Sequence, residues 1–235
     1  MKNFLSIDQG TTSSRSIIFD ANLNLVIDAQ EEYDLTYPED GWVELEPKKI
    51  IETVTNTLNK VVNADLGIEA CGITNQRETT IVWSKSTGEA IYPGIVWQDR
   101  RTHEYCSYLK SNGHESVIKE KTGLLLDPYF SATKIKWVLD NVDGAREKAS
   151  KGELLFGTVD SYLIYMLSKE KNHFTDVTNA SRTLLFNIKS MEWDDELLEL
   201  FEIPKTMMPE VLSCDGDFGN LKINDCEIPI RGVIG

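Results

Sequence analysis

Residue types that can bind phosphate gather near the N-terminus, between two short apolar runs. The first run, Phe4 to Ile7, ends at Asp8. Gly10, four consecutive hydroxyl residues and Arg15 then lead into the second run, Ile17 to Phe19. Two such runs joined through a glycine predict a tight hairpin of buried strands with its polar residues at the tip. The backbone amides, hydroxyls and guanidinium there are the donors and the positive charge that a phosphate group requires.

Asp8 adds a possible metal ligand to this hairpin. A carboxylate at the end of a strand suits a hydrated magnesium ion, which prefers oxygen ligands and keeps most of its water. The hairpin differs from a Walker loop, because no Gly-Lys-Ser/Thr sequence opens a helix here. An ordinary hairpin whose polar turn faces water is the alternative interpretation.

A second polar segment, Asn75 to Thr79, lies between two apolar runs that predict strands. Within it, Glu78 is suited to accept, and Arg77 to donate, hydrogen bonds to neighbouring hydroxyls of a small polyol. Such bonds are stronger than neutral ones because one partner is charged. A structural salt bridge or two solvated charges would explain the same pair without a ligand.

Two aromatic residues could complete a polyol site. Trp97 lies at a strand end before a charged segment, and an indole face can pack against the C–H side of a polyol. Tyr129 offers a phenol just before a predicted helix. Both residues could equally be parts of the core, since large aromatic side chains are usually well buried.

The order of predicted elements is that of one mixed α/β domain. Pro47 opens a helix whose apolar stripe includes Ile50, Val54 and Leu58. Further strands are expected at 23–33, 70–75, 79–84, 154–157 and 228–235, and further helices at 100–110, 130–141, 158–168 and 194–201. The last strand runs into a glycine turn at Gly235, a position beyond which catalytic groups often lie in α/β proteins. A natural chain rarely stops there, so we expect an N-terminal piece of a longer protein.

Composition excludes several classes of protein. With 235 residues, 41% hydrophobic and 26% charged, the chain is long enough for a sizeable core. The net charge of −14 argues against nucleic acid or an anionic membrane as partner. The four cysteines lack zinc-ligand spacing, and no membrane span or signal peptide is visible, so a cytoplasmic location is expected. His103, His114 and His173 have polar neighbours and are expected at the surface.

Seven motifs together resemble one family over nearly the whole chain. They are Asp-Gln-Gly-Thr-Thr-Ser-Ser-Arg (8–15), Gly-Trp-Val-Glu (41–44), Thr-Asn-Gln-Arg-Glu-Thr-Thr (74–80), Ile-Val-Trp-Gln-Asp-Arg-Arg-Thr (95–102), Gly-Leu-Leu-Leu-Asp-Pro-Tyr-Phe-Ser-Ala-Thr-Lys (123–134), Gly-Thr-Val-Asp-Ser-Tyr-Leu-Ile (157–164) and Thr-Asp-Val-Thr-Asn-Ala-Ser-Arg-Thr (175–183). The chain resembles the N-terminal half of an FGGY carbohydrate kinase, most closely of the glycerol kinases. The resemblance implies a ribonuclease H-like, actin-like ATPase fold, with a mixed central sheet and helices on both faces.

The resemblance also implies a role for each site residue. Thr11, Thr12, Ser13 and Arg15 would hold the phosphates of ATP, and Asp8 would lie near Mg²⁺. Arg77, Glu78 and Tyr129 would bind glycerol through hydrogen bonds, and Trp97 would pack against its carbon chain.

Other features of the family are expected outside this sequence. The catalytic aspartate would come just after Gly235, and the C-terminal nucleotide-binding domain is absent, so residues 1–235 are expected to be inactive alone. The full-length protein is expected to form homo-oligomers. The segment 218–227 lacks the Gly-Gly-Lys loop for fructose 1,6-bisphosphate and the phosphorylated histidine of some relatives. A kinase for another polyol or ketose, or a non-catalytic binding module, are the alternatives.

Overall fold

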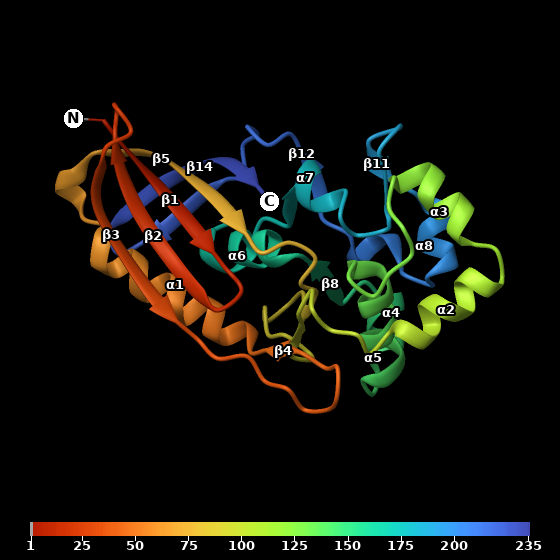
Figure 1. Cartoon of the computed structure of the whole chain (residues 1–235). Helices are drawn as coiled ribbons and strands as arrows, with labels where there is room; N and C mark the ends of the chain where they lie inside the picture. The colour runs from red at the N-terminus through yellow and green to blue at the C-terminus, as the bar shows by residue number, and fades with distance from the viewer. Residues whose placement is uncertain (1) are drawn as a thin grey trace.

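A six-stranded mixed sheet forms the centre of the computed structural model, which describes residues 2–235 apart from the side chain of Ala64 (Figure 1). In spatial order its strands are β13 (Asn220–Ile223), β14 (Cys226–Ile234), β5 (Ile68–Asn75), β1 (Asn3–Gln9), β2 (Ser13–Asp20) and β3 (Leu25–Glu32). β1 is antiparallel to β2 and parallel to β5, and β5 is parallel to β14. The carboxyl ends of β1, β5 and β14 therefore meet at one edge of the sheet.

Helices α1 (Pro47–Val61) and α6 (Val159–Leu167) pack on one face of this sheet and share its hydrophobic cluster. Pro47 occupies the first turn of α1, where its missing N–H costs no hydrogen bond, and the Glu46 side chain caps the helix. Two hydroxyl pairs, Ser14–Thr53 and Ser16–Thr57, join β2 to α1 at 2.8 Å each. This buried seam fixes the hairpin strand β2 against α1.

The opposite face of the sheet is open. Alternate residues of β1 are buried or accessible, and Phe4 and Asp8 are exposed. The predicted α/β fold with a central mixed sheet is confirmed. Both helices that cover the sheet lie on the same face, however, so helices expected on the second face are not among residues 2–235.

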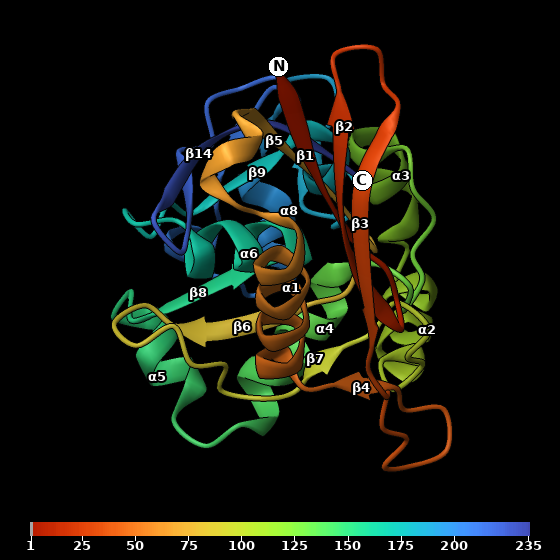
Figure 2. The same ribbon diagram turned by 90° about the vertical axis from the view of Figure 1, so that its left-hand side faces the viewer.

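A second hydrophobic cluster is mostly helical, and its helices lie to the right of the six-stranded sheet in Figure 1 and farther from the viewer in Figure 2. Its helices are α2 (His103–Ser111), α3 (Glu115–Thr122), α4 (Ser131–Asn141), α5 (Ala145–Ser150) and α8 (Asp195–Leu200). They pack around the antiparallel pair β6 (Ile81–Ser84) and β8 (Leu154–Gly157). Sequence analysis did not predict α3 or α5.

Short elements connect the two clusters. They are β4 (Glu44–Leu45), β7 (Gly94–Ile95), β9 (Phe174–Asp176), α7 (Val177–Ala180), β10 (Phe186–Asn187), β11 (Glu192–Trp193) and β12 (Glu210–Leu212), with 3₁₀ turns at Ala64–Leu66 and Lys205–Met207. β4 pairs with β7, β9 with β12, and β10 with β11. Among residues 2–235, no helix is long and apolar enough to cross a lipid bilayer.

His173 is not the surface residue that its polar neighbours suggested. Its ring packs edge-on against Trp83 with the centroids 5.4 Å apart, and Trp83 also contacts Tyr162 and Tyr165 at 5.2 and 5.5 Å. Its Nε2 lies 2.7 Å from the Phe156 carbonyl oxygen. Burial lowers the pKa of His173 to about 4, so the ring is neutral at pH 7.

Asp160, a fully buried carboxyl in α6, predicts an unusual pH dependence of stability. Its oxygens accept hydrogen bonds from Thr158 and Thr175, yet burial dominates and raises its pKa to about 7. An unfolded aspartate ionises near pH ~3.9, so between these values the unfolded state binds fewer protons and stability falls as pH rises.

We therefore expect the free energy of unfolding of Asp160→Asn, minus that of wild type, to rise by about 4 kcal/mol as the pH goes from 4 to 7. Urea unfolding of both proteins at several pH values in that range measures this difference. A difference that stays constant with pH would show that Asp160 ionises normally in the folded protein.

Candidate functional site

The predicted phosphate hairpin is present at the edge where the parallel strands end. Residues Gly10 to Thr12 connect β1 to β2, and the Gly10 amide donates to the Ser13 carbonyl at 2.9 Å. Within residues 2–235, the amides of Thr11 and Thr12 have no hydrogen-bond acceptor. Thr12 is exposed, while Thr11 and Ser13 are half-buried. Free, converging donors of this kind fit an anionic group.

Asp8 and Arg15 face each other across the hairpin on the open face of the sheet. They are direct partners in the antiparallel register of β1 and β2. The Arg15 guanidinium is held by Asp28 at 2.8 Å, with both side chains more than one third exposed. An exposed pair of this kind contributes about 1 kcal/mol or less, so Arg15 can exchange Asp28 for a phosphate at little cost.

A buried amide network ties the hairpin to the Asn75–Thr79 segment. Gln76 Nε2 donates to Gln9 Oε1 at 3.2 Å, to the Gly10 carbonyl at 3.1 Å and to the Tyr33 hydroxyl at 3.1 Å. The Tyr33 hydroxyl in turn donates to the Gly10 carbonyl at 2.7 Å. The tip of the hairpin is therefore hydrogen-bonded to Gln76, which directly precedes Arg77 and Glu78 in the chain.

Glu78 is the most constrained residue of that segment. Its backbone is left-handed, with φ at 63°, and its side chain is only 2% exposed. Oε1 accepts a hydrogen bond from Arg182 Nε at 2.6 Å. No group within residues 2–235 donates to Oε2. One carboxylate oxygen is thus fixed by a charged partner, and the other is left to accept from a ligand hydroxyl.

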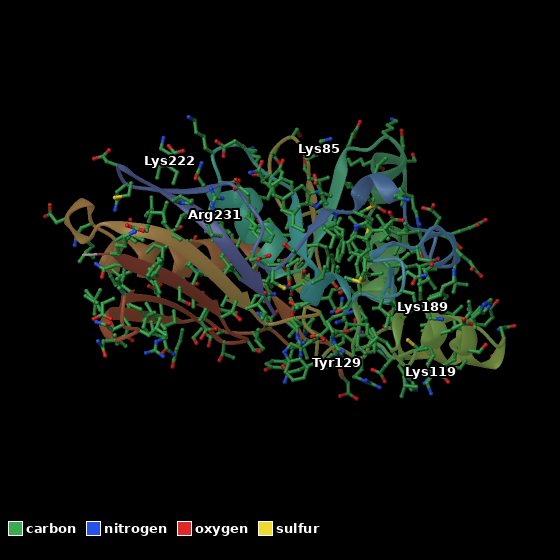
Figure 3. The ribbon with its side chains drawn as sticks, turned by 90° about the horizontal axis from the view of Figure 1, so that it is seen from above. Lys85, Lys119, Tyr129, Lys189, Lys222 and Arg231 are labelled. Carbon is green, nitrogen blue, oxygen red and sulfur yellow. The ribbon has the colours of Figure 1, made fainter. Side chains whose placement is uncertain are left out.

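The two predicted aromatic residues meet beside Glu78. The rings of Trp97 and Tyr129 are 5.6 Å apart between centroids, and Arg182 Cζ lies 5.9 Å from the Tyr129 ring. Burial raises the pKa of Tyr129, and the negative charge of Glu78 adds to this effect. Tyr129 lies between the six-stranded sheet and helices α2 and α3 in Figure 3. Neither aromatic residue is fully buried, as plain core residues would be.

Arg77 lies where β14 reaches the same edge. A Cβ built on Gly235 would be 2.6 Å from Arg77 Cγ and 2.8 Å from Asn179 Oδ1. The Gly235 amide donates to Thr178 Oγ1 at 2.8 Å. The structure thus brings all the predicted polyol residues, Arg77, Glu78, Trp97 and Tyr129, to the edge that carries the phosphate hairpin.

The family model for the FGGY family of carbohydrate kinases, N-terminal domain, matches residues 3–228. The chain belongs to the FGGY family. A glycerol kinase of Alteromonas mediterranea is 56% identical over the whole chain, and one of Oceanobacillus iheyensis is 54% identical. The chain covers 49% and 48% of these two proteins, so it spans about half the length of the curated relatives it matches.

Solved structures of FGGY kinases share the fold. The crystal structure of Plasmodium falciparum glycerol kinase with ADP superposes with a TM-score of 0.95 at 34% identity, over 100% of this chain and 48% of that one. Gluconate kinase from Lactobacillus acidophilus, at 23% identity and a TM-score of 0.86, shares the same fold over 99% of this chain. The predicted actin-like fold of this FGGY chain is therefore confirmed.

Sequence analysis missed two residues that shape the site of this FGGY protein. Arg182 pairs with Glu78, and Gln76 binds the hairpin. Both lie inside motifs that carried the family resemblance, at 175–183 and 74–80, but neither received a role. A lone arginine 104 positions away from its partner gives no local signal.

Trp97 couples the hairpin to the polyol residues, because its indole Nε1 donates to Thr11 Oγ1 at 3.2 Å. If the full-length protein has the kinase activity proposed in the next section, we expect Trp97→Phe to raise the KM for each of its two substrates by about threefold to tenfold, since one neutral hydrogen bond is lost. Steady-state kinetics with each substrate varied measures this effect. A rise confined to the polyol would show that the Thr11 contact does not position the hairpin.

Proposed function

We propose that residues 1–235 form the N-terminal, substrate- and phosphate-binding domain of a cytoplasmic, ATP-dependent glycerol kinase. The reaction transfers the γ-phosphoryl group of ATP to a primary hydroxyl of glycerol, giving glycerol 3-phosphate and ADP. The observation that carries this proposal is Glu78: one carboxylate oxygen is held by Arg182, and the other has no partner within residues 2–235 and lies beside Tyr129 and Trp97. The glycerol kinases at 52 to 56% identity support the choice of substrate.

The polyol residues offer complementary contacts to a three-carbon triol. Glu78 Oε2 accepts from one hydroxyl, and the Arg77 guanidinium donates to the next. We expect the Tyr129 hydroxyl to add a third bond and the indole of Trp97 to cover the C–H side. Charge-assisted bonds to neighbouring hydroxyls fix which hydroxyl faces the phosphate hairpin.

The hairpin supplies the phosphate contacts. The free amides of Thr11 and Thr12 and the hydroxyl of Ser13 hold the terminal phosphates, with Arg15 neutralising charge. Asp8 is exposed beside them and can hold Mg²⁺, which needs only one or two carboxylates when phosphates and water complete its shell. Within residues 2–235 there is no group of three or more His, Cys, Asp or Glu side chains that could hold a metal ion.

Transfer of the phosphoryl group depends mainly on positioning and charge neutralisation. The network through Gln76 and Trp97 holds the acceptor hydroxyl and the phosphate hairpin in a fixed relation. The longer relatives contain a second half that this chain does not cover, and we propose that it contributes the general base and the adenine contacts. Homo-oligomer formation by the full-length protein stays a prediction.

A coupled ADP-release assay tests the function. The full-length gene product is incubated with Mg-ATP and, separately, glycerol, xylulose, ribulose, erythritol and gluconate. We expect turnover with glycerol at a kcat/KM at least about 100-fold above that of the others, because unpaired polar groups penalise a mismatched polyol. A preference for another polyol would overturn the substrate, and no turnover with any of them would overturn the activity.

A further inference from the structure

Lys134 is a buried lysine that the proposed chemistry does not use. It lies in the first turn of α4 and is 1% exposed. Burial lowers the pKa of Lys134 to about 7, and the charges of Asp99 and Glu78 only partly oppose that shift. A lysine is rarely buried to this degree, because removing its charge from water is costly. Its contacts therefore indicate a specific role.

Lys134 Nζ joins the two loops that carry the polyol residues. It donates to the Tyr129 carbonyl at 2.7 Å and to the Glu78 carbonyl at 3.2 Å. Both acceptors are main-chain carbonyls. They belong to Glu78 and Tyr129, whose side chains form part of the proposed polyol site. A single amino group thus fixes the Glu78 backbone relative to the Tyr129 backbone.

The Glu78 backbone needs such support. A non-glycine residue in the left-handed region is strained, because its Cβ comes too close to the following carbonyl oxygen. Besides Lys134, the Glu78 carbonyl accepts from Thr80 Oγ1 at 3.2 Å and from Ser131 Oγ at 3.3 Å. Ser131 begins α4, so the first turn of this helix provides two of the three donors. Together they hold Glu78 in the conformation that turns its carboxylate toward Arg182.

We propose that Lys134 is a positioning residue that sets the spacing between the Glu78 carboxylate and the Tyr129 phenol. The inference rests on the proposed function, because the spacing matters only if both groups contact one polyol. Lys134 itself does not touch the substrate. Its loss loosens the acceptor site and leaves the hairpin, which Gln76 and Tyr33 hold independently, in place.

The test is a comparison of KM values in the full-length gene product. We expect Lys134→Met, which keeps the length of the side chain but removes its donors, to raise the KM for glycerol by about tenfold or more. The KM for ATP should stay within about twofold of wild type. The control is Lys136→Met on the same helix, whose Nζ binds Asp140 and Glu202 at 3.1 and 3.0 Å near the surface. It should change neither value.

The outcomes separate this proposal from the proposed function. Equal rises in both KM values, or an unchanged KM for glycerol, would overturn the positioning role. A wild-type enzyme that prefers another polyol overturns glycerol as the substrate, and the comparison is then made with the preferred polyol. If Lys134→Met does not fold, the KM values are measured in Ser131→Ala instead. That variant removes one of the donors to the Glu78 carbonyl and keeps Lys134. A raised KM for the polyol supports the role, and an unchanged one overturns it.

Discussion

Glu78→Gln in the full-length protein should lower kcat/KM for glycerol by about 100-fold or more. The glutamine has nearly the shape of the glutamate but no charge, so it loses both the ion pair with Arg182 and the charge-assisted bond to the glycerol hydroxyl. Because one amide atom is a donor, it also presents N–H groups where the carboxylate offered acceptors. Kinetics with glycerol varied at saturating ATP gives the value.

The specificity of this effect is tested in two ways. Glu120→Gln, on the surface of α3 with a 73% exposed side chain, is a matched control and should leave kcat/KM unchanged. In the variant at Glu78, the melting temperature should move little compared with the loss of activity, since the substitution is isosteric. Wild-type kinetics in the Glu78→Gln variant would exclude Glu78 as a polyol ligand.

The residues of the site that sequence analysis predicted lie in short contiguous motifs. Arg77 and Glu78 are adjacent, and the hairpin from Asp8 to Arg15 is a local structure whose turn and flanking strands are visible in the order of residue types. Trp97 and Tyr129 were ambiguous as isolated aromatic residues, and the family resemblance gave them a role. Local chemistry therefore predicted the groups that we propose as ligand contacts.

The groups that hold these residues in place were less predictable. Arg182 contacts Glu78, which is 104 positions away in the chain. Lys134 binds two main-chain carbonyls, and because every residue type has such a carbonyl, the sequence gives no sign of these contacts. His173 was assigned to the surface because its neighbours are polar, but packing against Trp83 is a tertiary contact. Helix α3, in contrast, had a usable signal, since Gly123 ends it with φ at 73°.

Arg182→Met should destabilise the protein and weaken glycerol binding together. The ion pair with Glu78 is a short one, with side chains 27% and 2% exposed, and the guanidinium also lies 5.0 Å from the Phe130 ring centroid. Removing the arginine leaves a carboxylate in a nearly dry site without its cation. That loss costs about 3 kcal/mol of unfolding free energy, at the lower end of values for buried pairs because Arg182 is partly exposed. Urea unfolding measures it.

A double variant shows whether the unpaired charge is the cause. Arg182→Met combined with Glu78→Gln leaves no buried carboxylate, so it should be more stable than Arg182→Met alone by about 1 to 2 kcal/mol, although glycerol turnover stays low. Arg146→Met removes an exposed pair with Asp140 and should cost about 1 kcal/mol or less. If the double variant were less stable than Arg182→Met, the arginine would act through packing on Tyr129 and Phe130. If the double variant recovers stability but not activity, the charge of Glu78 serves to bind the polyol. Arg182 then serves to stabilise that buried charge in the folded protein.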